Sequence, residues 1–580
     1  MNNNMVKAPW LNSYGTIPKS LDYPTGTMVD FLEDQALSFM DGPAYNFLGV
    51  KATYREFLDR IHTCAKALVA MGIKKGDKVT ICLPNMPQAI IMFYGLNLMG
   101  GIPNMVHPLS AQGEIAFYLN LSESVAAITL DAFYSKFESI RKETPKLENI
   151  IVTSIGEVLK PLMALGFWLS KGRKIAPVPV GPGTVFYKEF MEVGKKYKGE
   201  YKYQGKAQDP AVILYSGGTT GTTKGIVLSN LNFNALAMQT AALGDCLVTG
   251  HRMLAIMPVF HGFGLGVGIH TGLCYGCEEI LVPQFNVDTY GALLKKYQPN
   301  YIAGVPTLFE ALLRNKEMEQ VDLSCLEGVF SGGDSLSTEL KKKVDVFLKD
   351  RGAQVQIREG YGTTECVTAS CLTPKDFYKE GSIGIPFPDT YYKICKVETI
   401  EELPYGEDGE ICISGPSVML GYLKDPGETN NVLKTHSDGR TWLHTGDMGL
   451  MDSDGFIYFK QRIKRMIISS GYSIYPSQIE NVLDAHPAVL MSTVIGVPDA
   501  YKMEKVKAFL VLKPGIEETD EVKDSIYEHC IKNIARYAMP YEFEYRESLP
   551  RTLVGKVAYT VLEQEELTKL GDAEALGSLA

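Results

Sequence analysis

The sequence predicts an α/β protein with a large N-terminal domain of several βαβ-type sheets and a small C-terminal α/β domain. With 580 residues, the chain is too long for a single hydrophobic core. Patterns typical of amphipathic helices alternate with short apolar runs typical of buried strands, which indicates parallel βαβ units. A turn-rich cluster, Asp452-Ser453-Asp454-Gly455, is then followed by a separate set of strand and helix patterns.

The individual elements follow from local patterns. Residues 54–71 place apolar side chains along one side of a helix, and residues 78–83 form an apolar strand pattern that ends at Pro84-Asn85. Residues 89–99 predict a second helix, which ends at Gly100-Gly101. In the C-terminal part, residues 491–497 and 506–512 predict strands and residues 521–536 a helix. The predicted domains are therefore residues 1–463 and 464–580.

Composition narrows the class of protein. The chain has 57 basic and 67 acidic residues, a net charge of −10 and no basic block, so we expect no nucleic-acid partner. It has no run of 18 apolar residues and no signal-peptide pattern at its start. Its eleven cysteines are scattered, an odd number mostly in apolar surroundings, as in reducing compartments. We therefore expect a cytoplasmic protein.

A glycine- and threonine-rich loop has the composition of a polyphosphate-binding site. It follows the apolar run 211–214 and precedes the apolar run 226–228, so we expect it at the end of a sheet. Glycines let backbone N–H groups approach an anion, while the hydroxyls and a lysine add further donors. The order differs from a Walker A loop, where the lysine precedes Ser or Thr directly. The loop residues are Ser216, Gly217, Gly218, Thr219, Thr220, Gly221, Thr222, Thr223 and Lys224.

This loop resembles the phosphate loop of the adenylate-forming (AMP-binding) superfamily, and further motifs match in the right order from about Trp10 to Lys556. The resemblance implies that ATP, Mg²⁺ and coenzyme A take part in the reaction. It also implies that Tyr361 stacks on adenine, Thr364 contacts the α-phosphate, and Glu365 and Thr219 hold magnesium. The corresponding nucleotide-binding stretches are Tyr361-Gly362-Thr363-Thr364-Glu365 and Gly332-Gly333-Asp334.

The remaining motifs lie further along the chain. His444-Thr445-Gly446-Asp447 resembles the family segment whose aspartate binds the ribose hydroxyls, and Arg462, fifteen residues later, matches an arginine that reaches ribose and phosphates. Lys464 matches the hinge of the mobile C-terminal domain, and Gly471 the loop that meets the pantetheine arm. Lys556, in a Pro-Arg-Thr loop, matches the catalytic lysine.

An acyl pocket is implied next to these motifs. His261 matches a histidine beside the substrate carboxylate, so the implied catalytic residues are Lys556, Thr364 and His261. Glycines at alternate positions would leave room for an apolar tunnel, although the same pattern also suits a helix packed tightly on a sheet. The predicted pocket residues are Phe260, His261, Gly262, Phe263, Gly264, Leu265 and Gly332.

The closest resemblance within the superfamily is to bacterial long-chain fatty acyl-CoA synthetases. It implies ATP-dependent activation of a medium- to long-chain fatty acid through acyl-AMP, followed by thioester formation with coenzyme A. Three alternatives stay open: a ligase that loads a carrier protein, a CoA ligase for an aryl or steroid carboxylate, and a membrane-associated fatty-acid carrier. Residues within the segment 160–174 join an apolar stretch to four basic residues. This segment predicts either peripheral contact with the inner face of the membrane or a surface helix packed on the core.

Overall fold

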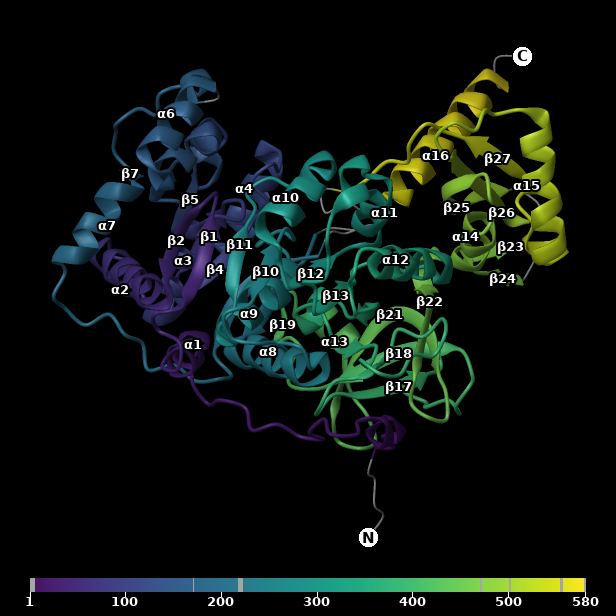
Figure 1. Ribbon diagram of the computed structural model, residues 1–580, viewed down its shortest axis with the longest axis horizontal. Helices are drawn as coiled ribbons and strands as arrows, with labels where there is room; N and C mark the ends of the chain where they lie inside the picture. Colours follow the sequence, from purple (N-terminus) through teal and green to yellow (C-terminus); the bar gives the residue numbers. More distant parts are fainter. Residues whose placement is uncertain are drawn as a thin grey trace, which may run out of the picture.

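The structure, a computed structural model, describes residues 6–170, 172–216, 223–469, 472–499, 502–552 and 556–577. Within these residues four β-sheets are surrounded and connected by helices (Figure 1). Three sheets are built from strands before residue 463, and the fourth from strands after it. The α/β fold class predicted from the sequence is confirmed.

The first sheet has nine strands, with a parallel centre and antiparallel edges. Strands β11, β12, β13 and β14 are connected in sequence by helices α10 (Tyr290–Tyr297), α11 (Pro306–Arg314) and α12 (Thr338–Asp350), as expected for βαβ units. In spatial order the strands are β16 (Ile385–Pro386), β15 (Cys371–Leu372), β14 (Ile357–Tyr361), β13 (Gly328–Ser331), β12 (Tyr301–Gly304), β10 (Arg252–Ala255), β11 (Glu278–Leu281), β1 (Pro43–Phe47) and β2 (Val50–Thr53).

The second sheet has eight strands and is parallel from β8 to β7, while β9 and β19 add antiparallel strands at one edge. The strands are β19 (Gly421–Tyr422), β9 (Gly225–Ser229), β8 (Pro210–Tyr215), β4 (Ile102–Met105), β3 (Lys78–Cys82), β5 (Ala126–Leu130), β6 (Asn149–Thr153) and β7 (Thr184–Phe186).

The third sheet is entirely antiparallel, which the alternation of helix and strand patterns did not predict. Turns join β20 to β21 and β21 to β22, so these neighbours pair antiparallel. The longer connection from β18 to β20 contains helix α13 (Pro426–Val432), but β18 and β20 are not neighbours in the sheet. Its strands are β17 (Tyr391–Cys395), β18 (Gly409–Ser414), β21 (Thr441–Met451), β20 (Leu433–Thr435) and β22 (Ile457–Arg462).

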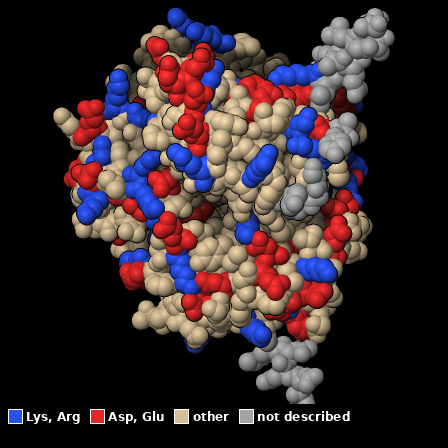
Figure 2. All heavy atoms as spheres, turned by 90° about the vertical axis from the view of Figure 1, so that its right-hand side faces the viewer, with Lys and Arg blue, Asp and Glu red and all other residues tan. Residues whose placement is uncertain are grey.

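The fourth sheet is mostly antiparallel, and β27 adds a parallel strand. Its strands are β24 (Tyr472–Ile474), β23 (Ile467–Ser469), β26 (Met503–Leu512), β25 (Val489–Asp499) and β27 (Glu542–Tyr545). Figure 2 shows the face of the molecule on the side of the fourth sheet. Basic and acidic side chains are interspersed on this face and do not form separate patches.

The helices begin and end where local signals predict. A capping box between Thr53 and Glu56 opens α2, and Gly100, in the left-handed conformation, ends α3. The helices are α1 (Met28–Ala36), α2 (Tyr54–Ala70), α3 (Pro87–Met99), α4 (Gln112–Ser122), α5 (Tyr134–Ser139), α6 (Pro161–Ser170), α7 (Tyr187–Lys196), α8 (Asn230–Gly244), α9 (Gly272–Cys274), α10 (Tyr290–Tyr297), α11 (Pro306–Arg314), α12 (Thr338–Asp350), α13 (Pro426–Val432), α14 (Pro476–Asp484), α15 (Asp520–Asn533) and α16 (Tyr559–Gly577).

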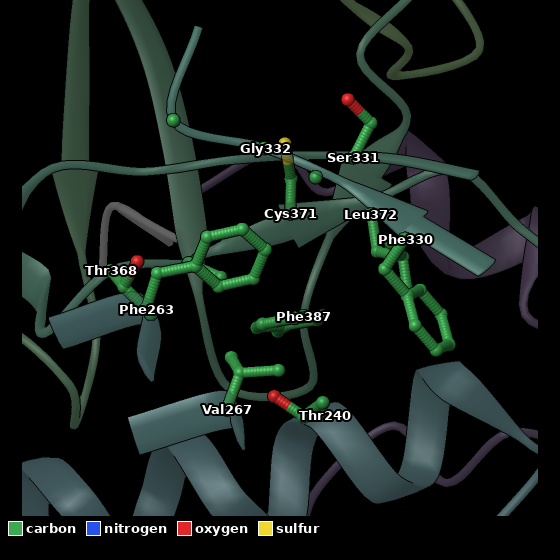
Figure 3. A pocket seen from close by; sticks show the side chains of 13 residues that line it. Thr240, Phe263, Val267, Phe330, Ser331, Gly332, Thr368, Cys371, Leu372 and Phe387 are labelled. Atoms are coloured by element: carbon green, nitrogen blue, oxygen red, sulfur yellow. The ribbon is translucent and has the colours of Figure 1, made fainter. Parts of the chain in front are cut away.

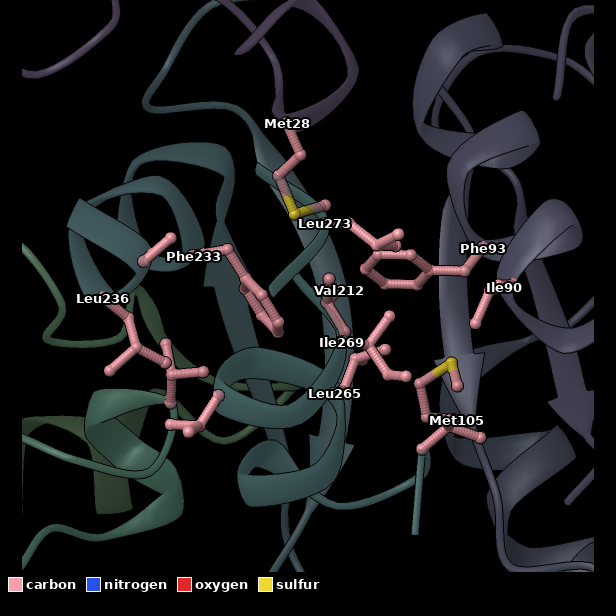
Figure 4. Close-up of a cluster of buried hydrophobic side chains, with 14 of the residues drawn as sticks. Met28, Ile90, Phe93, Met105, Val212, Phe233, Leu236, Leu265, Ile269 and Leu273 are labelled. Atoms are coloured by element: carbon pink, nitrogen blue, oxygen red, sulfur yellow. The ribbon is translucent and has the colours of Figure 1, made fainter. Parts of the chain in front are cut away.

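The main core lies between the two large sheets. Figure 4 shows Phe93 of α3 and Phe233 of α8 converging on Ile269, which belongs to the π-helical segment η6 (Phe263–Thr271). All three side chains are buried. Segment η6 therefore packs against α3 and α8 on one side, while its first turn faces the candidate site.

Candidate active site

The candidate site lies beyond the carboxyl ends of two neighbouring parallel strands, β13 and β14. Strand β13 leads into Gly332-Gly333, and β14 ends at Tyr361. A Cβ atom on Gly332 would lie 3.1 Å from the carbonyl oxygen of Gly360, and Gly333 has φ +82°, so glycine suits both positions. Carboxyl ends of parallel strands are where α/β sheets usually bind ligands.

Strands β21 and β22 bring the predicted ribose-binding residues to the candidate site. Asp447 and Arg462 are direct cross-strand partners, which explains their separation in the sequence. The Arg462 Nε atom lies 2.8 Å from Asp447 Oδ1, and the Tyr361 hydroxyl donates to Asp447 Oδ2 at 2.6 Å. Phe459 of β22 lies beside the Tyr361 ring, with 5.8 Å between ring centroids. These residues form one connected group with a carboxylate at its centre.

Glu410 of β18 supports the part of strand β21 that carries Asp447. Glu410 accepts hydrogen bonds from His444 Nδ1 at 2.7 Å and from the Gly446 backbone at 2.9 Å. Glu410, His444 and Cys412 also place one potential metal-ligand atom each within 4.8 Å of one another. Because these groups already bond to each other or to the backbone of β21, they support Asp447 rather than form a second site. Glu410 was not predicted from the sequence.

Asp447 is almost fully buried, and burial raises the pKa of its carboxyl group although Arg462 and Tyr361 lower it. The charge of Asp447 in turn raises the pKa of the Arg462 guanidinium. A buried carboxylate with two oxygens suits a vicinal diol, which offers two hydroxyl donors. The geometry therefore agrees with the ribose role expected for Asp447.

Lys556 reaches the same site from the C-terminal part of the chain. A Cβ atom on Gly333 would lie 3.7 Å from Lys556 Cε. Burial and Arg462 lower the pKa of the Lys556 ammonium group, while Asp334 and Asp447 raise it. Lys556 therefore lies among the predicted nucleotide-binding residues.

His261 lies close enough to Lys556 for the lysine charge to affect its pKa. Burial, and then Lys556, lower the pKa of the His261 imidazole to about 4. Its Nδ1 atom accepts a hydrogen bond of 3.2 Å from the Phe263 backbone. His261 is therefore neutral at neutral pH and can donate through its other nitrogen.

The predicted phosphate loop is the connection of a β-hairpin formed by β8 and β9, so the predicted flanking apolar runs are both strands. The Ser216 N–H donates to the Lys224 carbonyl at 3.3 Å, which joins the two ends of the loop. The predicted residues Gly217, Gly218, Thr219, Thr220, Gly221 and Thr222 lie outside the described residues, as does Gly471.

Lys224 has partners that the sequence did not predict. Its ammonium group forms an ion pair with Glu428 of α13 and lies 4.9 Å from the centroid of the Tyr422 ring. The Tyr422 hydroxyl donates to Glu365 Oε1 at 2.8 Å. The phosphate loop and the predicted metal ligand are thus connected through Tyr422. An acidic residue in the first turn of a helix, as at Glu428, gives no local sign of so distant a partner.

The other residues of the Tyr361 motif divide into two groups. Thr364 and Glu365 begin a 3₁₀ turn, Thr364–Cys366, and are half-buried, so both remain accessible to a ligand. Thr363 is buried, and its N–H and hydroxyl bond to the Cys366 sulfur. In the structure Thr363 therefore supports the turn, and its contact with nucleotide stays a prediction.

A narrow cavity of about 40 Å³, which opens to solvent, adjoins Gly332 and Gly333. Figure 3 shows Phe263, Val267 and Phe387 around it, with Thr240 at the end away from Gly332. None of the thirteen described residues that line it is charged. The cavity therefore suits an apolar group.

Two of the predicted pocket residues, Phe263 and Gly332, line this cavity, and the others do not. Leu265 is buried in the core, and Phe260 packs on the His107 ring at 4.2 Å between centroids. Of the two interpretations of the alternating glycines, close packing accounts for Gly262, Gly264 and Gly266, and the tunnel stays a prediction. A Cβ atom would lie 1.7 Å from the Val367 carbonyl oxygen at Gly262, 2.1 Å from the Pro258 oxygen at Gly264 and 2.6 Å from Leu236 at Gly266.

The predicted hinge residue, Lys464, lies in the 3₁₀ turn η10 (Ile463–Arg465) between β22 and β23. Its charge helps to lower the pKa of Glu428, after the larger effects of Lys224 and Asn431. Lys464 is therefore near the Lys224–Glu428 pair in this conformation.

Two family models and several known proteins match most of this chain. Residues 32–423 match the family model described as "AMP-binding enzyme", and residues 478–556 match "AMP-binding enzyme C-terminal domain". A long-chain-fatty-acid–CoA ligase of Bacillus subtilis is 36% identical over 568 residues, which cover 96% of this chain and 98% of that protein. A protein of the same name from Salmonella typhimurium is 33% identical over 97% of this chain and 99% of its own length. Among solved structures, ATP-bound MatB from Rhodopseudomonas palustris is similar in fold, with a TM-score of 0.80, 24% identity and coverage of 93% of this chain and 99% of that one.

Proposed function

Because this chain belongs to the AMP-binding enzyme family, we propose that it joins a medium- to long-chain fatty acid to coenzyme A in an ATP-dependent, AMP-forming reaction. The relatives named long-chain-fatty-acid–CoA ligase support this choice of substrate and acceptor. The observation that carries it is the uncharged cavity beside Gly332 and Gly333, next to Lys556. A carboxylate near Lys556 could then extend its tail into the cavity.

In the first proposed step, a carboxylate oxygen of the acid bonds to the α-phosphorus of ATP, and the bond to the bridging oxygen of pyrophosphate breaks. Asp447 would hold the ribose, and Tyr361 the adenine ring. Lys556 and Thr364 would stabilise negative charge on the phosphate oxygens, since positioned donors act most strongly where charge develops. His261 would bind the substrate carboxylate as a neutral donor.

In the second proposed step, the thiol of coenzyme A loses its proton to water, its sulfur bonds to the acyl carbon, and AMP leaves with the electrons of the broken carbon–oxygen bond. We propose that the domains 1–463 and 464–580 rotate about Lys464 between the steps, removing Lys556 and bringing in Gly471. Two observations support this division. Every strand of the fourth sheet follows Lys464, and Lys464 lies in a short turn between two sheets.

Magnesium fits this site through Glu365. Within the described residues Glu365 forms no ion pair, and it bonds to the neutral Tyr422 hydroxyl, so its negative charge remains available to a hard cation. We propose Glu365 and Thr219 as the residues that hold it. When bound, Mg²⁺ would neutralise charge on the polyphosphate.

The test is thioester formation measured across acids from C2 to C18 and across aromatic acids, with coenzyme A and with a carrier protein as acceptors. We expect the highest kcat/KM for medium- to long-chain acids with coenzyme A. A preference for aromatic acids would replace the fatty-acid assignment, and transfer only to a carrier protein would replace the acceptor. Absence of ATP–pyrophosphate exchange with every acid would contradict adenylation altogether.

A cavity variant ties the substrate to the structure. Thr240 lines the far end of the cavity, and its hydroxyl oxygen is buried with no hydrogen-bond partner among the described residues, so replacing it breaks no hydrogen bond there. Thr240→Phe should fill that end and reduce activity on long acids more than on short ones. Thr240→Val, similar in volume to threonine, is the matched control. An equal loss for all acids in Thr240→Phe would mean that the tail does not occupy this cavity.

A further inference from the structure

Helix α6 is apolar on every side and yet exposed. Ser170 is its only residue with a polar side chain. None of its residues is buried, and Leu162 and Trp168 are 81% and 55% exposed. A helix that is apolar all round is normally covered, either by a protein core or by lipid.

The position of α6 in the fold explains why no core covers it. It lies in the connection between the parallel strands β6 and β7, and β7 is the edge strand of its sheet. Crossover helices of parallel sheets usually pack an apolar face on the sheet. Instead, α6 lies at the periphery, and its main neighbours are the adjoining turns η4 (Ile155–Val158) and η5 (Gly172–Lys174) (Figure 1). Helix α7, which follows β7, does bury Tyr187 and Phe190.

The charges around α6 indicate what covers it. The segment 160–174 contains four basic residues and no acidic one, although the whole chain has a net charge of −10. The described basic residues Lys160, Arg173 and Lys174 flank the helix at its two ends. Basic side chains next to exposed aromatic and aliphatic ones are complementary to anionic lipid headgroups above hydrocarbon.

The length of α6 limits how it can meet a bilayer. Ten residues span roughly 15 Å, about half of a hydrocarbon core of roughly 30 Å. No helix in the described part of the chain is long and apolar enough to cross a membrane. We propose that α6 is a docking element that lies in the surface of an anionic phospholipid bilayer. This inference does not depend on the acyl specificity proposed above.

Trp168 provides a direct measurement of this docking. The other two tryptophans, Trp10 and Trp442, are 1% and 0% exposed, so only Trp168 can move from water into lipid. With vesicles of phosphatidylcholine and 30% phosphatidylglycerol, tryptophan emission of the full chain should shift to shorter wavelength. Brominated lipids should quench it, and Trp168→Phe should abolish both effects. A lack of quenching in the unmodified protein would overturn the proposal.

Variants then test which features of α6 carry the binding. Replacing Leu162, Leu165 and Leu169 by Ser leaves Trp168 as reporter and should weaken vesicle binding at least tenfold. The matched control replaces three exposed apolar residues elsewhere, Leu37, Val346 and Ile531, by Ser and should bind normally. Equal weakening in both variants would overturn the role of α6.

Two further points are tested separately: the contribution of the basic residues to lipid binding, and a second copy of the chain as the alternative partner of α6. Arg173→Glu with Lys174→Glu should remove the preference for phosphatidylglycerol over pure phosphatidylcholine vesicles, and high salt should do the same in the unmodified protein. Binding that ignores both lipid charge and salt would contradict the electrostatic part. Analytical ultracentrifugation distinguishes a second copy of the chain as the occupant. A dimer that the three leucine substitutions dissociate, without vesicle binding, would assign the helix to self-association instead.

Discussion

Asp447→Asn tests the centre of the candidate site with little change in shape. In the structure the Asp447 carboxylate accepts from the Tyr361 hydroxyl at 2.6 Å and pairs with Arg462 at 2.8 Å. If the ribose hydroxyls of ATP also bind this carboxylate, the variant replaces charged acceptors by one neutral carbonyl. We therefore predict a weaker interaction with ATP and an unchanged affinity for the acid.

The size of the effect follows from the hydrogen bonds involved. A hydrogen bond to a charged group contributes about 1.5–3 kcal/mol. The amide would recover part of two such bonds, so a net loss of about 2–3 kcal/mol is expected, which corresponds to a roughly 30- to 150-fold higher KM for ATP. Tyr361→Phe, which removes one donor but keeps the ring and the carboxylate, should change this KM by less than about tenfold.

Stability should not confound this experiment. Burial raises the pKa of Asp447 above its ordinary value, so the ionised group opposes folding at neutral pH, and removing the charge relieves that penalty. Arg462 would lose its partner, but its side chain is 53% exposed and keeps water around it. Steady-state kinetics with varied ATP, beside a thermal melt, give the answer. An unchanged KM for ATP in a folded Asp447→Asn protein would remove Asp447 from the ribose site.

Three further predictions concern Lys556 and Glu365 of the candidate site and Glu359 of strand β14. Lys556→Ala should slow ATP–pyrophosphate exchange roughly a hundredfold or more while leaving thioester formation from supplied acyl-AMP largely intact; equal losses in both assays would contradict a role confined to adenylation. Glu365→Gln should raise the magnesium concentration needed for half-maximal rate, since a neutral amide is a poorer ligand for a hard cation, whereas an unchanged magnesium dependence would exclude Glu365 as a ligand. Burial raises the pKa of Glu359 to about 8 from an unfolded value near 4.5, so its contribution to stability is complete below pH 4.5 and is lost as the pH rises towards 8. The melting temperature of Glu359→Gln, relative to that of the unmodified protein, should therefore rise between pH 5 and 8. A difference in melting temperature that stays constant over this range would argue against a buried neutral carboxyl.

Local patterns predicted most of the fold. Helix α3 and strand β3 form where an apolar run ends at Gly100-Gly101 and at Pro84, because glycine and proline act on the backbone of their own turn. The antiparallel arrangement of the third sheet was missed because it does not depend on local patterns. Whether two strands pair parallel or antiparallel depends on the connection between them, and the strand pattern itself is the same in both cases.

Motifs point to individual residues of the candidate site, whereas contacts between residues far apart in the sequence leave no local pattern. Asp447 and Arg462 come from recognisable stretches, and β21 and β22 bring them together. The ion pair of Lys224 with Glu428 joins residues 204 positions apart, and no periodicity predicts such a contact. The glycines of η6 could not be interpreted from the sequence for a different reason. The absence of a side chain suits close packing and an open tunnel equally well.

The two interpretations of residues 160–174, a helix packed on the core and a helix at a membrane surface, predict different burial of the same side chains. A helix packed on the core would need at least one face of Phe167, Trp168 and Leu169 to be covered by the sheet or its neighbours. The structure leaves Trp168 and Leu169 exposed and Phe167 only half-buried, at the edge of the sheet. Exposure of large apolar side chains costs free energy in water, about 1.5–3 kcal/mol for each that full burial would cover. The packing interpretation therefore loses the burial on which it depends, and a partner outside the chain becomes the simpler explanation of the same residues.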